Sequence, residues 1–96
     1  MIMNKYVKGT ILTKEYELNV NRLTDIVSDL KWTYFETYHM EPKFIKIPIW
    51  VHILLRQYAR QLIGYYIIEE KTILTYMGLQ ICETSSIDKI EDIEVF

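Results

Sequence analysis

Residues 43–63 read KFIKIPIWVHILLRQYARQLI and carry the clearest structural signals of the 96-residue chain. Polar and apolar side chains alternate as far as Ile47, which predicts a short strand. Pro48 then suits the first turn of a helix, where its missing N–H is no loss. That helix should run to about Ile63, with Gly64 just beyond its end, and more than half of its circumference is apolar. We therefore expect a strand that leads into a central, largely buried helix.

Upstream of this stretch, the apolar period changes at Asn21. Residues 6–20 alternate and predict one strand or a loose pair of strands. From Asn21, which we predict as the helix N-cap, apolar side chains recur every three or four residues and define one helix face. Pro42 should end this helix shortly after His39. The expected core face consists of Leu23, Ile26, Val27, Leu30, Tyr34 and Tyr38.

Downstream of the central helix, the sequence predicts short strands. Residues 65–68 form a strand or fray from the helix end. Residues 73–76 and 79–83 are rich in β-branched and aromatic side chains, and the two residues between them, Met77 and Gly78, are typical of a hairpin turn. Residues 87–96 predict a single helical turn followed by an edge strand.

The predicted fold is α+β, in the order β-α-β-α-β-β-β, with two helices packed on one face of a small mixed or antiparallel sheet. A chain of 96 residues is too short to build two domains with cores of their own, so we expect one domain over residues 1–96. The composition, 50% hydrophobic and 25% charged, is typical of a folded globular protein.

Features that would direct the chain to a membrane or an oxidising compartment are not evident. The N-terminus lacks the basic, apolar and small-residue order of a signal peptide. The longest apolar run, residues 47–55, is interrupted by Pro48 and His52 and falls far short of the roughly 20 residues that a membrane span needs. The single cysteine, Cys82, excludes an internal disulfide. We expect a protein of the cytoplasm, its own cell's or an infected host's, or of a virion, without a membrane partner.

The inventory of catalytic residue types is poor. No G-x-S-x-G, P-loop, G-x-G-x-x-G or H-E-x-x-H pattern occurs. His39 and Glu41 give only half of a zinc-deaminase signature, and we favour His39 as a cation near a helix end. Cys82 lies in a predicted strand, where packing is favoured over nucleophilic chemistry. We favour a solvated edge over a cation site for the acidic cluster, which comprises Asp88, Glu91, Asp92 and Glu94. The sequence therefore predicts a protein without catalytic residues, metal or cofactor.

Charge is distributed unevenly, although the net charge is only −2. The segment from Glu83 onward holds five acids and one base, Lys89, whereas no acid occurs between Pro42 and Ile68. On the second helix, basic side chains recur every four residues and form one stripe. Two functions are open for this stripe, an anion-binding patch and a contact with the acidic tail of a neighbouring copy, but we favour a simple solvated face. The anion-contact candidates are Lys43, Lys46, His52, Arg56 and Arg60.

Aromatic side chains are abundant, with eight tyrosines, three phenylalanines and two tryptophans. Tyrosine and tryptophan are enriched in protein interfaces, so the composition favours self-association or a protein partner. Trp32 and Phe35 fall about 100° or more from the core face of the first helix. A second packing layer or an interface would account for them equally well. Our interface candidates are Trp32, Phe35 and Trp50.

The C-terminal half resembles small proteins of tailed bacteriophages. The similarity begins at Glu41 and Pro42, continues through the Thr75–Ile81 segment TYMGLQI, and ends with the Ile90–Val95 segment IEDIEV. In those proteins a hairpin of the form aromatic–x–Gly–aliphatic–x–aliphatic often precedes an acidic and aliphatic end strand. The resemblance covers residues 41–96 and implies a virus-encoded protein without enzymatic activity. It transfers no functional residue.

Three functions follow as hypotheses. The first is a non-enzymatic viral protein, structural or host-modulating, that forms a homo-oligomer and binds a host or virion protein. The second is a small nucleic-acid-binding module that uses the basic stripe. The third and least favoured is an enzyme that depends on Cys82 or His39.

The central helix can be tested by truncating its side chains. We expect Ile53→Ala and Leu54→Ala each to lower the free energy of unfolding by about 2–5 kcal/mol, because each would leave a cavity in the core. Denaturant titrations measure these losses. Losses below about 1 kcal/mol at both positions would show that the helix is not central.

Overall fold

The computed structural model describes residues 6–63 and 75–96, with side chains in α2 described as far as Ala59, and its fold is α+β, as predicted. The predicted strand at residues 65–68 and the predicted cap at Gly64 lie outside the described residues. The elements in order are β1 (Tyr6–Ile11), β2 (Lys14–Asn19), α1 (Val20–Tyr38), β3 (Phe44–Pro48), α2 (Ile49–Ile63), β4 (Thr75–Tyr76), β5 (Leu79–Thr84), the 3₁₀-helix η2 (Ile90–Asp92) and β6 (Glu94–Val95).

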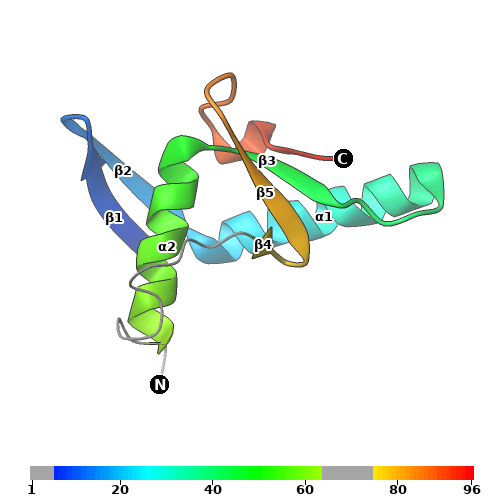
Figure 1. Cartoon of the computed structure of the whole chain (residues 1–96), viewed down its shortest axis with the longest axis horizontal. Helices are drawn as coiled ribbons and strands as arrows, with labels where there is room; N and C mark the ends of the chain where they lie inside the picture. Colours follow the sequence, from blue (N-terminus) through cyan, green and yellow to red (C-terminus); the bar gives the residue numbers. More distant parts are fainter. Residues whose placement is uncertain (1–5, 64–74) are drawn as a thin grey trace.

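The described strands divide between two sheets, where the sequence suggested one (Figure 1). β1 and β2 form an antiparallel hairpin of their own. The other sheet has the order β4-β5-β3-β6, in which β3 is parallel to β5 and antiparallel to β6. It is therefore mixed. As predicted, the chain ends in a short strand at the sheet edge.

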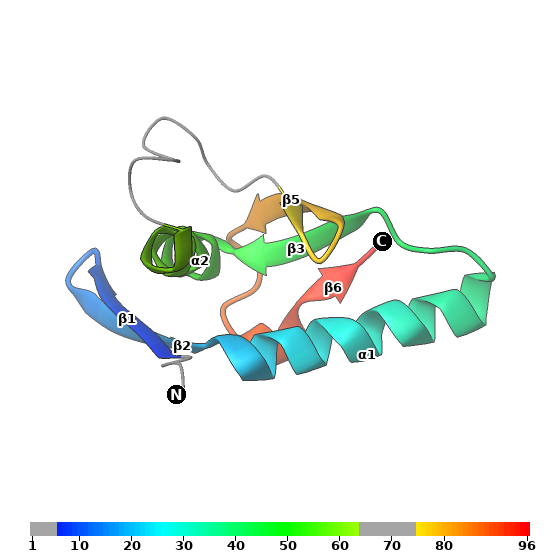
Figure 2. The same cartoon turned by 90° about the horizontal axis from the view of Figure 1, so that it is seen from below.

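The two helices pack mainly against different sheets (Figure 2). α1 runs beneath the four-stranded sheet, whereas α2 leaves the end of β3 and lies against the β1–β2 hairpin. Two helices side by side on one sheet face, the expected arrangement, are therefore not what the chain forms. The reason is that the first segment pairs with itself and gives α2 a surface of its own to cover.

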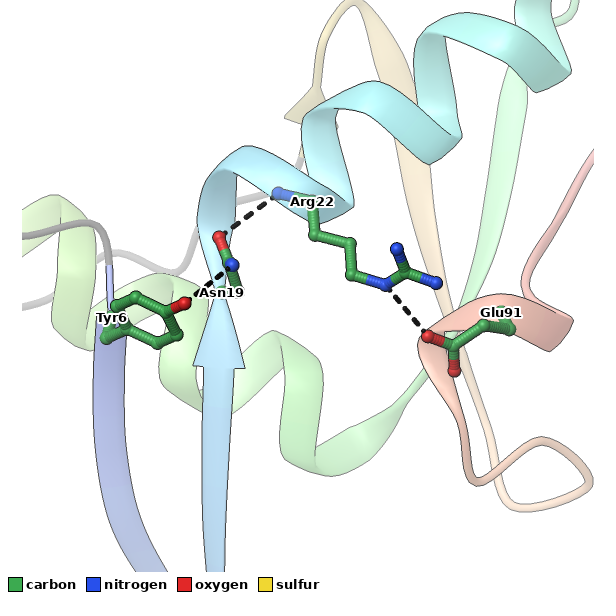
Figure 3. Close-up of polar contacts among 4 residues, drawn as sticks. All are labelled: Tyr6, Asn19, Arg22 and Glu91. Atoms are coloured by element: carbon green, nitrogen blue, oxygen red, sulfur yellow. Dashed lines mark hydrogen bonds and ion pairs between the residues drawn. The ribbon is translucent and has the colours of Figure 1, made fainter.

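α1 begins two residues earlier than predicted, because Asn19 and not Asn21 caps it. The Asn19 backbone is extended, and its Oδ1 accepts a hydrogen bond of 3.1 Å from the backbone N–H of Arg22 (Figure 3). Its Nδ2 donates to the hydroxyl of Tyr6 on β1, at 3.1 Å. One side chain therefore ties the hairpin to the helix. At the other end of α1, His39 adopts a left-handed backbone with φ 56° and closes the helix.

Polar contacts join α1 to the β4–β5 hairpin. The hydroxyls of Thr24 and Tyr76 lie 2.7 Å apart, and burial raises the pKa of Tyr76. The Lys31 ammonium donates to the carbonyl of Met77, at 2.8 Å. Met77 and Gly78 form the predicted two-residue turn, and both have positive φ.

α2 is central, as predicted. Pro48 is the last residue of β3 and is fully buried, and the helix begins at the next residue. Leu54 is fully buried, whereas Ile53 is only half-buried, so truncation at Leu54 should be the costlier of the two. The apolar core comprises Val7, Leu18, Val20, Leu23, Val27, Ile45, Ile47, Val51, Leu54, Leu55, Leu79, Ile90 and Ile93.

In the part of the chain that the structure describes, no helix has the length and apolar character needed to cross a membrane.

The contact between α2 and the hairpin gives a test of this packing. A Cβ atom at Gly9 would lie 2.8 Å from Cδ2 of the buried Leu54. We expect Gly9→Ala to lower the free energy of unfolding by about 1–3 kcal/mol through overpacking. Leu54→Ala removes the obstructing atom, so the cost of Gly9→Ala should largely vanish in that background. Denaturant titrations of the double-mutant cycle measure the coupling, and equal costs in the two backgrounds would contradict this contact.

Candidate functional site

Helix α1 is longer than the sheet that it supports. Its 19 residues span about 28 Å, whereas the five residues of β3 span about 17 Å. The buried residues of α1 are Val20, Leu23 and Val27, all in its first half. Figure 2 shows its C-terminal turns continuing past β3 and β6. Among the described residues, the second half of the helix therefore has one side that no other element covers.

Tyr34 and Tyr38 continue the core face of α1 into these C-terminal turns. They keep the phase of Leu23 and Val27, but Tyr34 is only half-buried and Tyr38 is 59% exposed. The prediction that Tyr38 is a core residue was wrong, because the sheet ends before it. The two rings contact each other, with centroids 4.6 Å apart. With β6 and Phe96 they border a groove of about 620 Å³.

Trp32 and Phe35, two of the predicted interface residues, lie on the neighbouring side of the same turns. They are 62% and 43% exposed, and their rings stack with centroids 6.3 Å apart. They border a hollow of about 340 Å³ together with Ser28, Lys31, Glu41 and Met77. We call Trp32, Tyr34, Phe35 and Tyr38 the aromatic helix end.

Trp50, the third predicted interface residue, lies elsewhere and is half-buried. Its ring stacks on Tyr16 of β2, with centroids 4.8 Å apart and planes at 16°. Its indole N–H donates to the carbonyl of Asp88, at 2.8 Å. Trp50 therefore joins α2 to the hairpin and to the segment before η2, which accounts for this tryptophan by packing within the chain.

The predicted basic stripe does not form a continuous solvated face. His52 is only 8% exposed, and its Nδ1 lies 2.5 Å from a Glu83 carboxylate oxygen. Arg56 is half-buried, and its Nε is a buried atom without a hydrogen-bond partner among the described residues. The side chain of Arg60 lies outside the described residues. The stripe was thus misread as the wet side of α2, because a β5 carboxylate 31 residues away in sequence turns one of its members into a buried pair.

The two predicted lysines of the anion-contact set lie on or beside β3. Lys46 lies 4.0 Å from Glu94 and 5.4 Å from the centroid of the Phe96 ring. Lys43 is exposed, and its backbone N–H donates to the carbonyl of Phe96. Lys46 is therefore already close to an acidic side chain of β6, Glu94.

The acidic tail is likewise engaged within the chain. Arg22 Nε donates to a Glu91 carboxylate oxygen at 3.0 Å (Figure 3). The pKa of Glu91 is lowered, chiefly by a hydrogen bond from its own backbone N–H and then by the Arg22 guanidinium. With Glu94 beside Lys46, two of the four acids of the acidic cluster have a basic partner in the same copy. Glu91 and Glu94 are therefore less available to attract basic side chains of another copy.

The residues weighed for catalysis are separated. Cys82 is half-buried in β5, opposite Lys46 of β3. His39 is the exposed residue that closes α1, and its backbone N–H donates to the carbonyl of Phe35. Within residues 6–59 and 75–96, no three His, Cys, Asp or Glu side chains gather closely enough to hold a metal ion.

No protein-family model, curated protein or solved structure matches this chain. The resemblance of residues 41–96 to tailed-phage proteins therefore stays a prediction.

The Arg22–Glu91 pair predicts a pH dependence of stability. Since the folded-state pKa of Glu91 is lowered, the unfolded chain takes up this proton first as the pH falls. The stabilisation is therefore present above the unfolded-state pKa and is lost as the pH falls through the folded-state pKa. We expect Glu91→Gln to lower the free energy of unfolding at neutral pH and to have little effect at strongly acidic pH.

Urea titrations across the acidic range measure this difference. Arg22→Gln is the matched variant, and it should remove only part of the pH dependence, because the backbone hydrogen bond is the larger cause. A Glu91→Gln effect that does not change with pH would contradict the assignment.

Proposed function

We propose that this protein acts by binding and not by catalysis, and that the aromatic helix end is the surface on which a second copy docks. A single observation carries the proposal: α1 continues past its sheet with core-type side chains on its surface. Tyr34 and Tyr38 are in phase with the buried residues Leu23 and Val27, and no element of the described part of the chain covers them fully. Trp32 and Phe35 widen this surface.

The size of the surface predicts how tight the contact is. A buried aromatic side chain removes about 150–250 Å² from water, so four rings that are roughly half exposed offer about 300–500 Å² of apolar area. At about 25 cal/mol per Å², the gross gain is roughly 8–12 kcal/mol. Association itself costs an estimated 4–15 kcal/mol. The two terms are similar, so self-association should depend strongly on concentration.

The charges of the molecule favour a protein partner over nucleic acid. A nucleic-acid surface needs basic side chains that are free to meet phosphates. Lys46 lies beside Glu94, and His52 is buried against Glu83. The helix end, in contrast, carries apolar rings, which are the typical anchors of protein interfaces.

The proposal predicts concentration-dependent association that is lost when the rings are removed. We expect the wild type to form a multimer in light scattering and sedimentation equilibrium, at low and at high salt alike, because apolar surface holds it together. Trp32→Ser/Phe35→Ser should be monomeric at the same concentrations and keep its circular dichroism spectrum. Ile49→Ser, which removes a 46% exposed apolar side chain from the first position of α2, is the control and should associate as the wild type does.

A wild type that stays monomeric throughout, or a Trp32→Ser/Phe35→Ser variant that associates normally, would overturn the proposal. So would a monomer that binds DNA or RNA with strong salt dependence, which would place the protein among nucleic-acid-binding modules.

A further inference from the structure

The turn of the β1–β2 hairpin is unusual for its type. Leu12 and Thr13 connect the strands, and both have positive φ, 51° and 68°. Two-residue hairpin turns of this geometry normally use asparagine and glycine, because other side chains are strained there. A leucine and a β-branched threonine are among the least suited residues. Local backbone preference therefore does not explain the leucine at this position.

Leu12 is also the most exposed of the described large apolar side chains, at 93%. The strands that present it are paired along their whole length, from Tyr6 with Asn19 to Ile11 with Lys14. The hairpin is braced from one side by α2, with which β1 makes close contact at Gly9. The chain thus holds an apolar side chain out into solvent at the tip of a fully paired hairpin.

The hollow beside Trp32 is the surface that matches the exposed Leu12 side chain. Trp32, Phe35 and Met77 give this open surface hollow an apolar lining, and its volume is about 340 Å³. The hairpin turn lies at one end of the long axis of the molecule, and the C-terminal half of α1 extends toward the other (Figures 1 and 2). A copy therefore cannot place its own leucine in its own hollow.

We propose that Leu12 of one copy inserts into the hollow between Trp32, Phe35 and Met77 of the next copy. The hollow carries one base and one acid, Lys31 and Glu41, and Lys14 and Glu15 likewise follow the turn, so the pairing rests on apolar contact and not on net charge. The contact joins two different surfaces and is heterologous, so it repeats head to tail instead of closing as a symmetric dimer. This inference rests on the proposed function, since it names what covers part of the aromatic helix end.

A mixing experiment tests the pairing. The tip variant is Leu12→Asn, which removes the apolar side chain while suiting the turn, and should melt no lower than the wild type. The hollow variant is Trp32→Ser/Phe35→Ser. Each should associate about 10- to 100-fold more weakly than the wild type, as the burial of one leucine predicts. Mixed in equal amounts, they should form a one-to-one complex that grows no further, because one intact tip meets one intact hollow.

Thr13→Asn is the matched control, because it relieves the same turn and keeps the leucine. It should associate as the wild type does, and a loss of association there would overturn the proposal by showing that the turn backbone and not the Leu12 side chain matters. Light scattering of each protein and of the mixture gives the result.

The remaining outcomes separate this inference from the proposed function. If the tip variant associates normally and only the hollow variant is monomeric, the helix end pairs in another way, and the head-to-tail contact is refuted while the proposed function stands. If both variants are monomeric but the mixture forms no complex, the contact is likewise refuted. Normal association of the hollow variant would refute both.

Discussion

The architecture depends on a junction without a loop, where β3 ends at Pro48 and α2 begins at Ile49. Ile45, Ile47 and Pro48 are buried, so the strand cannot shift along its neighbours β5 and β6 without exposing apolar side chains. Because no flexible residue separates the two elements, the direction of α2 is set by the sheet. α2 therefore leaves the sheet at its end, and its apolar surface has to be covered there by other parts of the chain.

The β1–β2 hairpin provides that cover, and this placement determines the position of α1. The helix starts at the hairpin, where Asn19 both caps it and bonds to Tyr6, and it must then cross beneath the sheet. A helix rises only 1.5 Å per residue but here has 19 residues, so it passes the short strands β3 and β6 before it ends. The uncovered aromatic rings are thus a consequence of where the helix begins and how long it is.

Local patterns in the sequence predicted most of the helices and strands, but not how far each one extends beyond the elements packed against it. The alternation before Pro48, the apolar period of α2 and the Met77–Gly78 turn all depend on neighbours in the chain, and they appear as predicted. The phase of Trp32 also identified it as a residue off the core face. Tyr38 was wrongly predicted as a core residue. A helical period shows on which face of the helix a residue lies, but it does not show how far the opposing sheet extends. The pairing of His52 with Glu83 joins residues 31 apart and leaves no periodic signal.

The Leu12–Thr13 turn shows a different limit. Without glycine or asparagine it carries none of the usual turn signals, so the first segment could be read only as one strand or a loose pair. The lack of glycine and asparagine concealed the turn in the sequence. Once the backbone is known, the same lack makes Leu12 informative, since the fold gains nothing from an apolar side chain at a strained and solvated position. The loop-free β3–α2 junction fixes the hairpin at one end of the molecule and the overhanging helix at the other. The separation between tip and hollow is therefore the same in every copy, which is the condition under which a head-to-tail contact can repeat with constant geometry.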